Sequence, residues 1–446
     1  MSILYATIFG EFLLLGFFIV LFILLRSAAL SFWLFWRTQH FAVATPMVLL
    51  ELMIPREIMK SPKAMEQVLT AISTARNAPA NIKAKYWDGE ITRSFSLEVV
   101  SFDGNVHFYV RVPQVAKNLV EATFFSYYPD IEVEEVPDYI NRLPDNASDA
   151  EMKSQVVWGA EIVLAREAAY PIRSYLDFES PDEEKQYDPI GTFLEVFGKL
   201  KVGETACFQI IITPKDAKWK DAWKDLLKEL KERKDAKPSA GGLQIEFPGG
   251  GPLPAFIVPE EKKEETPRMT IRTPGEVKVI EAVENNLSKP AFDSLIRFLY
   301  VGPKGSSNEG GVFSGLMGAL NQYQALNLNS FRPNPAMVTR TSQWVKPYVF
   351  PEQRLWYRRE RILFNYRIRE TPMGTFAGKL ITSFLFNFNT HSQMFELNTE
   401  SLATLFHPPT RMVLTAPHIE RVESRKSGAP AGLAVYGEES DIEKFK

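Results

Sequence analysis

The pattern of apolar and polar positions divides the chain into an apolar N-terminal stretch and a long remainder of ordinary soluble composition. Residues 12–25 carry no charge, and the mostly apolar character reaches back to Ile3 with Glu11 as the single charge. A helix that crosses the hydrocarbon core of a membrane needs about 20 mostly apolar residues. We therefore predict a transmembrane anchor with an interfacial aromatic segment over residues 1–37.

Charged residues on either side of this stretch predict its orientation. No Lys or Arg precedes Arg26, while Arg37, Arg56 and Lys60 follow on the C-terminal side. The missing basic n-region and cleavage site favour a retained anchor over a removable signal peptide. The positive-inside rule places the N-terminus outside and the remainder in the cytoplasm, at the inner membrane of a bacterial cell. Glu11 is either a functional carboxylate within the membrane or, more simply, a residue near the outer interface.

Residues 45–140 show the alternating pattern of a small α+β domain. The predicted order is strand, helix, strand, strand, helix and strand, over residues 46–58, 61–75, 94–102, 105–113, 114–128 and 131–136. Asp103 and Gly104, a pair that tolerates the positive φ of a tight hairpin, join the two middle strands. This order is that of a ferredoxin-like (split βαβ) domain, an antiparallel sheet with both helices on one face.

A second α+β domain is predicted over residues 155–235 and 270–423. Its predicted strands and helices alternate over residues 156–165, 188–200, 204–214, 216–234, 275–288, 292–302 and 310–326, with residues 380–389 as a last strand. Residues 236–269 are rich in Pro, Gly and charge, which predicts a flexible insertion or linker. With residues 217–289 set aside as a helical or disordered insertion, the remaining order again fits a ferredoxin-like domain, in which residues 380–389 supply the last strand. Residues 424–446 are expected to be a mobile tail.

Composition and motifs exclude several classes of function. The formal net charge of -3 argues against a chain that coats nucleic acid with its whole surface. The single cysteine, Cys207, excludes an internal disulfide framework and is interpreted as a small core residue. The sequence contains no G-x-x-x-x-G-K-[ST] phosphate-binding loop, no pair of histidines at i and i+4 and no G-x-S-x-G nucleophile elbow. We therefore assign no catalytic residue, cofactor or metal, and expect a protein that is not an enzyme.

Two histidines are given structural interpretations. His107 lies inside a predicted strand, where a paired or edge position is more common than a metal ligand. His407, in the sequence FHPP, is expected to orient a loop rather than to act in catalysis.

One basic and aromatic segment, residues 354–369, is the candidate interface. Its candidate contact residues are Arg354, Arg358, Arg359, Arg361, Trp356 and Tyr357. Arginine interleaved with aromatic residues suits phosphate contact and base stacking. It equally suits a protein interface, where Arg, Trp and Tyr are enriched. The third alternative is internal pairing with acidic residues such as those of residues 132–135, and the sequence leaves all three open.

Several phrases together resemble a known family. They are VLLELMIPREIMKSPKAMEQVL, FDGNVHFYVRVPQVAKNLVEATFFSYYPDIEVEEVPDY, the strand and loop at residues 160–188, and LNTESLATLFHPPT. They are similar to the membrane-anchored N-terminal region of conjugative-transfer (type IV secretion-like) ATPases of small-genome bacteria, and to stand-alone relatives of uncharacterised function. The resemblance covers about residues 48–423. In the full-length family members a P-loop motor follows this region; this chain contains no such motif, so the resemblance implies no ATP hydrolysis and transfers no catalytic residue.

The combined expectation is a non-catalytic, single-pass membrane scaffold or adaptor. It would position a partner, either a separate motor ATPase or further copies of itself, in a secretion, DNA-transfer or surface-filament machine. The alternative is a membrane-tethered nucleic-acid-binding module that uses residues 354–369. An enzyme with dispersed site residues is the third possibility, and no small-molecule substrate is identified.

Overall fold

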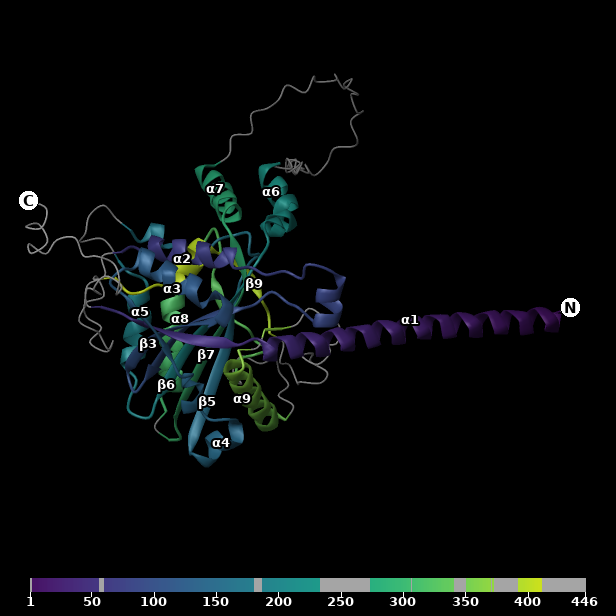
Figure 1. Cartoon of the computed structure of the whole chain (residues 1–446), viewed down its shortest axis with the longest axis horizontal. Coiled ribbons are helices and arrows are strands. Elements are labelled where there is room, and N and C mark those ends of the chain that lie inside the picture. The colour runs from purple at the N-terminus through teal and green to yellow at the C-terminus, as the bar shows by residue number, and fades with distance from the viewer. Residues whose placement is uncertain are drawn as a thin grey trace, which may run out of the picture.

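The protein combines one long helix with one α+β body, as the computed structural model in Figure 1 shows. The residues described are 2–55, 60–179, 187–232, 273–305, 307–340, 350–369, 371–372 and 392–410. Within these residues the strands form one nine-stranded sheet, and every pair of neighbouring strands is antiparallel. The predicted α+β class and the long apolar N-terminal helix are confirmed.

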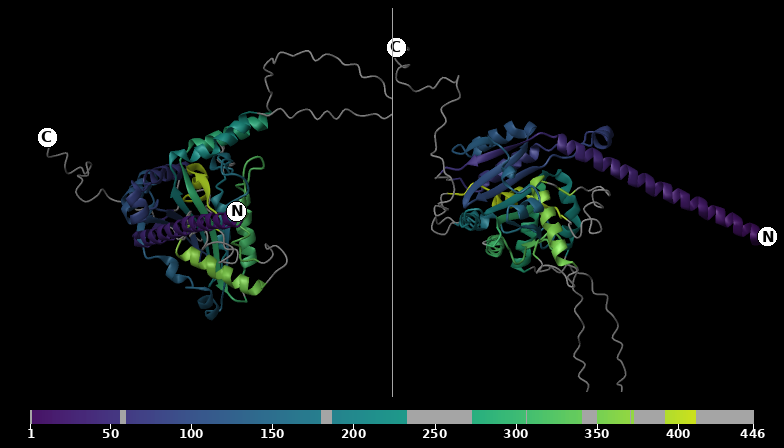
Figure 2. Two further views of the ribbon diagram at one scale, coloured as in Figure 1. Left: turned by 90° about the vertical axis from the view of Figure 1, so that its right-hand side faces the viewer. Right: turned by 90° about the horizontal axis from the view of Figure 1, so that it is seen from below.

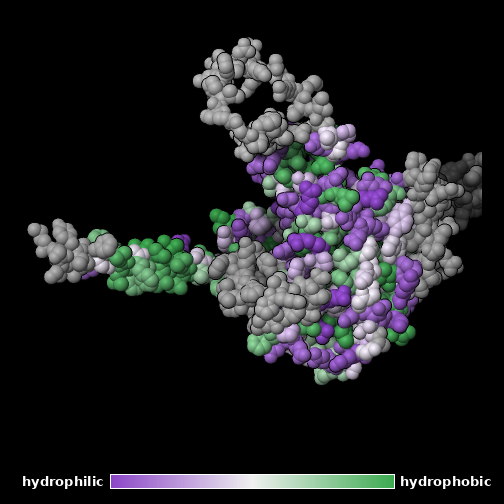
Figure 3. Space-filling view, turned by 180° about the vertical axis from the view of Figure 1, so that it is seen from behind, coloured by the Kyte–Doolittle hydropathy of each residue, from purple (hydrophilic) through white to green (hydrophobic). Residues whose placement is uncertain are grey.

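Helix α1 (Ser2–Ala44) projects away from the body, as Figure 1 and the right view of Figure 2 show. At about 1.5 Å per residue it is about 65 Å long. It continues beyond the predicted boundary at Arg37 because Pro46 is the first residue that disfavours helix, through its effect on Thr45. Its length and apolar composition suit a helix that crosses a membrane, and Figure 3 shows its hydrophobic surface extending clear of the body.

The first half of the sheet has the predicted order of elements. The Asp103 and Gly104 turn has positive φ at both residues, as the hairpin prediction requires. The strands lie side by side in the order β4-β1-β3-β2. The elements are β1 (Met47–Met53), α2 (Lys63–Thr74), β2 (Phe95–Phe102), β3 (Asn105–Pro113), α3 (Lys117–Tyr127) and β4 (Glu132–Val136).

The second half of the sheet repeats this arrangement. Its strands lie in the order β6-β7-β5-β8, so in both halves the fourth strand neighbours the first, and the third lies between the first and the second. The fourth position is taken by the short strand β8, whereas the predicted last strand at residues 380–389 lies outside the described residues. The elements are β5 (Gln155–Leu164), α5 (Ile190–Gly198), β6 (Thr205–Pro214), β7 (Ala291–Pro303), α8 (Glu309–Asn321) and β8 (Phe331–Pro333).

The two halves join through their second strands. β2 and β6 pair antiparallel from Phe95 opposite Ile212 to Phe102 opposite Thr205. Pairing of equivalent strands in opposite directions relates the halves by an approximate two-fold axis perpendicular to the sheet. A two-fold axis perpendicular to the sheet does not exchange its two faces. The helices of both halves therefore cover the same face.

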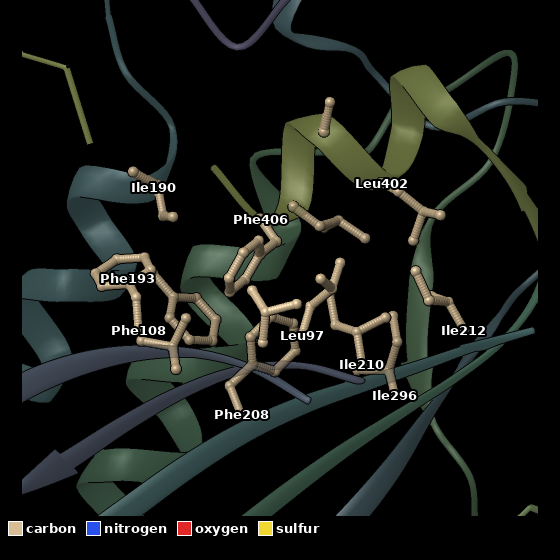
Figure 4. Packing of buried hydrophobic residues seen from close by; sticks show 14 of the residues in the cluster. Leu97, Phe108, Ile190, Phe193, Phe208, Ile210, Ile212, Ile296, Leu402 and Phe406 are labelled. Atoms are coloured by element: carbon tan, nitrogen blue, oxygen red, sulfur yellow. The ribbon is translucent and has the colours of Figure 1, made fainter. Parts of the chain in front are cut away.

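That face holds the main hydrophobic core. Alternate side chains of the strands pack against α2, α3, α5 and α8, and against α12 (Thr399–Leu405), which follows the short strand β9 (Phe395–Asn398). Figure 4 shows Leu97, Phe208 and Ile210 of the two central strands beneath Leu402 and Phe406. The Phe208 ring centroid lies 4.8 Å from that of Phe298 on β7, so the aromatic layer continues from β6 into the second half of the sheet.

On the opposite face, fewer elements of the described part of the chain pack against the sheet. They are α4 (Ala147–Met152), the short helix η3 (Tyr139–Arg142) and α9 (Pro351–Arg367). This face therefore contains a smaller hydrophobic cluster, and α9 provides its buried Ile362, Leu363 and Tyr366.

A third small cluster lies where the insertion leaves the body. The predicted charged helix at residues 216–234 is divided into the 3-10 helix η6 (Ala217–Trp223) and α6 (Lys224–Lys231), and it packs on α7 (Pro274–Ser288). Its apolar side chains lie in one cluster, because Trp219 is buried and Trp223, Leu226, Leu227 and Leu230 pack there as well. The predicted linker at 236–269 and tail at 424–446 lie outside the described residues.

Candidate interface on helix α9

Helix α9 is the element that contains the predicted interface. Pro351 occupies its first position, where the missing N–H is not needed, and Arg367 lies in the last turn, where the helix dipole favours a cation. Neither glycine nor a second proline interrupts the helix. Its inner face buries Ile362, Leu363 and Tyr366 against the sheet, and Arg358 and Asn365 are buried as well.

Two arginines on α9 bind the body rather than facing solvent. Arg358 is buried and donates hydrogen bonds to the carbonyl oxygens of Pro335 (3.0 Å) and Val338 (2.8 Å). Arg367 donates through Nη1 to three backbone carbonyl oxygens within residues 140–144. Burial lowers the pKa of Arg358 to about 10, which still leaves the guanidinium charged at neutral pH. Both side chains therefore hold the helix in place.

A fully buried polar row crosses the centre of the sheet beneath the end of α9. Glu98 on β2 is opposite Gln209 on β6, Gln209 is opposite Arg297 on β7, and Arg297 is opposite Glu161 on β5. All four side chains have no solvent exposure. Gln209 Nε2 donates to Glu98 (3.1 Å), and Arg297 Nε donates to Glu161 (3.0 Å). We call these four residues the polar ladder.

Arg369, two residues beyond α9, connects the helix to the polar ladder. Its guanidinium donates to both carboxylate oxygens of Glu98 (2.7 and 3.0 Å) and to both of Asp138 (2.7 and 3.1 Å). The Tyr139 hydroxyl donates to Glu98 at 2.6 Å and lies 2.5 Å from the Tyr366 hydroxyl. Arg369 adopts a φ of 52°, an uncommon conformation for a non-glycine residue. These contacts hold the end of α9 in a fixed position on the sheet.

The electrostatics of this cluster follow from burial and from the ion pair. Burial alone raises the pKa of Glu98, but the Arg369 charge and the hydrogen bonds outweigh it and lower the pKa to about 2. The same carboxylate raises the pKa of Arg369 above its ordinary value, although burial acts in the opposite direction. Burial raises the pKa of Tyr139 and of Tyr366, so both phenols stay protonated. The charged groups therefore serve as a permanent internal pair.

The outer side of α9 presents a stripe of aromatic, aliphatic and arginine side chains. Steps of three and four residues keep side chains on one side of a helix, and here they connect Arg354, Tyr357, Arg361, Phe364 and Ile368. Tyr357, Phe364 and Ile368 are 49%, 45% and 50% exposed. The Arg361 guanidinium lies 5.7 Å from the centroid of the Phe364 ring. We call these five residues the outward stripe.

The six predicted contact residues fall into different environments. The Trp356 and Tyr357 rings touch, with centroids 5.2 Å apart. By burial, Arg358 is inside, Tyr357 is exposed, and the half-buried residues are Arg354, Trp356, Arg359 and Arg361. The structure thus divides the segment between an internal clamp and an outward surface, and a role in binding a partner stays a prediction.

The sequence reasoning did not find the polar ladder or its bond to Arg369. The available signal was a charged residue inside each of three otherwise apolar strands, at Glu98, Glu161 and Arg297. A charge at a buried strand position requires a partner, but the residues that supply one are distant in the sequence. Strand register brings Arg297 to Glu161, and the position of the end of α9 brings Arg369 to Glu98.

Asp188 and His407 form a second buried pair, which attaches the end of the described chain to α5. Asp188 accepts hydrogen bonds from the Ile190 amide (3.1 Å), from His407 Nε2 (2.9 Å) and from the Thr410 amide (2.9 Å). Burial raises the pKa of Asp188, but His407 and the hydrogen bonds outweigh it and lower the pKa. The other ring nitrogen of His407 lies 2.8 Å from the Ala403 carbonyl oxygen. This arrangement is consistent with a histidine that orients its loop.

The remaining candidate residues have structural surroundings. Cys207 is buried, and burial raises the pKa of its thiol to about 12, so its interpretation as a core residue is confirmed. His107 pairs with Glu51, with Nδ1 2.7 Å from Oε1, which confirms the predicted paired histidine. Across the described residues, no group of three or more His, Cys, Asp and Glu side chains is placed to hold a metal ion.

A comparison with models of known protein families finds none that matches the chain, and a search of curated proteins finds no match. The geometry above therefore carries the functional interpretation.

Proposed function

We propose that this protein is a non-catalytic scaffold that a single N-terminal helix anchors in a membrane. The exposed apolar surface of α1 carries the proposal. Large apolar side chains such as Phe17, Phe22 and Leu25 are exposed there, and none of the described residues of the body buries them. Burial of one such side chain stabilises a protein by about 1.5–3 kcal/mol relative to exposure to water. A lipid bilayer is the environment in which this helix is stable.

The orientation that we propose has the body on the cytoplasmic side of the inner membrane. Arg26 and Arg37 lie on the side of the apolar stretch that leads to the body, and Glu11 lies on the other side. An excess of arginine and lysine marks the cytoplasmic side of a span.

This topology is tested with reporters fused after Lys446 in bacterial cells. A reporter that is active only in the cytoplasm should be active, and one that is active only outside should not. The control is a double substitution, Phe18→Arg with Val20→Arg, because each central arginine costs about 2.5–3.5 kcal/mol on insertion. The control should move the protein from the membrane fraction to the soluble or aggregated fraction. Activity of the external reporter, or a wild-type chain that alkaline carbonate extracts from membranes, would contradict the proposal.

We also propose that each half of the sheet is a ferredoxin-like unit. The order of strands is the same in the two halves, and the order of elements is the same once η6, α6 and α7 between β6 and β7 are set aside; each is the order expected of a split βαβ unit. The helices of both units cover one face, which leaves the other face to be covered by α9. In this interpretation α9 is an addition to the two units, placed to present the outward stripe.

The partner that we propose for the outward stripe is a separate motor ATPase. The stripe repeats at steps of three and four residues, the spacing at which one helix presents a seam to another helix. Tyr357 and Phe364 supply the aromatic anchors typical of the centre of a protein interface, and Arg354 and Arg361 flank them. The resemblance to conjugative-transfer ATPases supports a motor as the partner, because this chain contains no phosphate-binding loop.

Nucleic acid is the alternative ligand for the same segment. Arg358, Arg367 and Arg369 are used for internal contacts, so fewer arginines of the segment remain to neutralise phosphates. The apolar share of the outward stripe also fits a protein surface better than a phosphate backbone.

Site-specific photo-crosslinking tests the partner. A benzophenone amino acid replaces Tyr357 or Phe364 in the full chain in cells, and the same replacement at the exposed Leu326 is the control. Mass spectrometry should identify an ATPase with a phosphate-binding loop crosslinked at 357 and 364 but not at 326. Crosslinks to a second copy of the chain would contradict a motor ATPase as the partner and indicate self-association. Crosslinks only to lipid or nucleic acid would contradict any protein partner at this surface.

A further inference from the structure

A loop of the body lies against α1 near Trp33 and Arg37, in the C-terminal part of the helix. Residues 81–89, between α2 and β2, include the short π-helix η1 (Ala84–Asp88). The Trp33 indole N–H donates to the Tyr86 carbonyl oxygen at 2.8 Å, and the rings of Trp33 and Trp87 lie 5.6 Å apart. Arg37 donates through Nε to the Trp87 carbonyl oxygen. We call residues 81–89 the clasp loop.

Gly89 shows that this contact is close and specific. Its φ is +71°, and a Cβ at this position would lie 2.4 Å from the carbonyl carbon and oxygen of Arg37. Only glycine combines that conformation with so close an approach of two backbones. The clasp loop is therefore held at the level of residues 33–37 of the helix.

The side chains that the clasp loop leaves exposed have the composition of a membrane-interface element. Ile82 is 79% exposed and Trp87 is 63% exposed, and Lys83 and Lys85 are exposed beside them. The Lys85 ammonium lies 5.3 Å from the centroid of the Tyr86 ring. Aromatic rings, an aliphatic side chain and lysines together are typical of segments that lie in the headgroup layer.

The length of the span places the clasp loop at that layer. The helix rises about 33 Å between Glu11 and Trp33, close to the hydrocarbon thickness of about 30 Å. With Glu11 at one interface, Trp33 lies at the other, and Arg26 extends its long side chain toward the same interface. The hydrogen bond from Trp33 to Tyr86 then sets the clasp loop at the same depth. Figure 1 shows the loop's segment beside α1, on the side of the body from which the helix leaves.

We propose that the clasp loop is inserted into the interfacial layer of the membrane beside α1. Ile82, Tyr86 and Trp87 contact the acyl boundary, and Lys83 and Lys85 contact lipid phosphates. The proposal rests on the membrane span proposed above. A single helix would let the body tilt relative to the membrane surface, whereas a helix and an inserted loop together set that tilt and so the angle at which α9 faces the membrane.

Site-directed spin labelling of the full chain in lipid nanodiscs of phosphatidylcholine and phosphatidylglycerol tests this placement. The buried Cys207 is replaced by alanine, and single labels are placed by Ile82→Cys, by Val20→Cys within the span and by Leu326→Cys on an exposed turn of the body. Oxygen reports accessibility from lipid, and a nickel chelate reports accessibility from water. The ratio of oxygen to nickel accessibility at 82 should be several-fold higher than at 326 and lower than at 20.

The outcomes separate this inference from the proposed span. A lipid-like label at 20 with a label at 82 as water-accessible as that at 326 would overturn the insertion of the clasp loop and leave the anchor intact. A water-accessible label at 20 would overturn the span and the inserted loop together. A Trp33→Phe substitution removes the bond to Tyr86, and in that variant the label at 82 should become more accessible to the nickel chelate.

Discussion

At the scale of single residues, the least expected feature is a charged pair at the centre of the body. Glu98 and Arg369 are both buried, and removal of two charges from water costs more than their mutual attraction alone repays. The cost is offset because Glu98 also accepts hydrogen bonds from Ser96, Tyr139 and Gln209. The hydrogen bonds of this pair are directional, whereas an apolar contact is not. The pair therefore fixes the position at which α9 ends on the sheet.

Loss of the Glu98 charge should destabilise the protein strongly. In Glu98→Gln the buried Arg369 guanidinium loses its buried carboxylate and keeps only the half-exposed Asp138 as an anionic partner, so we expect a loss of about 3–5 kcal/mol in the free energy of unfolding. Urea denaturation followed by circular dichroism measures it. Glu135→Gln, which removes an exposed carboxylate paired with Lys117, is the matched control and should cost less than about 1 kcal/mol. Equal losses of unfolding free energy in the two variants would show that the buried pair contributes no more to stability than the exposed one.

The same pair predicts a pH dependence. The pKa of Glu98 is lowered to about 2 in the folded state from 4.5. Its stabilising effect is therefore complete above pH 4.5 and is lost as the pH falls toward 2, and the shift corresponds to about 3 kcal/mol. The difference in unfolding free energy between wild type and Glu98→Gln should shrink between pH 5 and pH 3. A difference that stays constant over this range would contradict the assigned pKa.

At the scale of elements, α9 separates two tasks that its sequence mixes. Its inner side packs Ile362, Leu363 and Tyr366 on the sheet, and Arg358 and Arg367 bind backbone carbonyl oxygens there. Its outer side carries the outward stripe. Because the two sets lie on opposite sides of one helix, stability and partner binding should respond to different substitutions.

Alanine substitutions on the two sides of α9 test this separation. Ile362→Ala removes a fully buried side chain that packs against Gly159, and it should cost about 2–5 kcal/mol of stability. Tyr357→Ala with Phe364→Ala should change stability by less than about 1 kcal/mol and should abolish binding of the partner that crosslinking identified. Thermal unfolding and quantitative pull-down of the crosslinked partner measure the two effects. A large stability loss in the Tyr357 and Phe364 variant would mean that the stripe is covered by the chain itself.

The junction between α1 and the clasp loop is tested by Gly89→Ala. The added Cβ meets the Arg37 backbone at 2.4 Å at a positive φ, so the loop must move away from the helix. We expect a cost of about 1–3 kcal/mol and faster amide hydrogen exchange in residues 81–90. Gly305→Ala, also at a positive φ but with open space around its Cβ position, is the control and should leave exchange at 81–90 unchanged. Unchanged exchange in the Gly89 variant would show that the loop does not depend on this contact.

At the scale of the whole molecule, the two predicted domains share one continuous sheet. β2 and β6 pair over their length, and a single hydrophobic cluster extends from α2 and α3 to α5 and α8. The body therefore offers one rigid support for α9, whose buried contacts reach both halves. Glu98 belongs to the first half, and Arg297 to the second.

A substitution at the junction should consequently weaken both halves. Phe208→Ala removes a fully buried ring next to Phe193 and Phe298, and should cost about 3–5 kcal/mol. Hydrogen exchange should lose protection by a similar factor in β3 of the first half and in β5 of the second, as in a single cooperative unit. Val202→Ala, at an exposed turn, should change neither. Loss confined to β5, β6 and β7 would indicate independently folding halves.

The sequence by itself determined the local features of this protein. The charge-free stretch in residues 12–25, the Asp103 and Gly104 hairpin and the periodic faces of the helices depend on neighbouring residues, and each gives a detectable pattern. Only the tertiary structure decided which side of α9 faces the sheet, that Arg358 and Arg369 are internal, and that the two halves join at β2 and β6. Those facts depend on strand register and on contacts such as Glu98 to Arg369, between residues far apart in the chain. A local sequence pattern can indicate that a residue is buried and needs a partner. It does not identify the distant residue that the fold brings into contact with it.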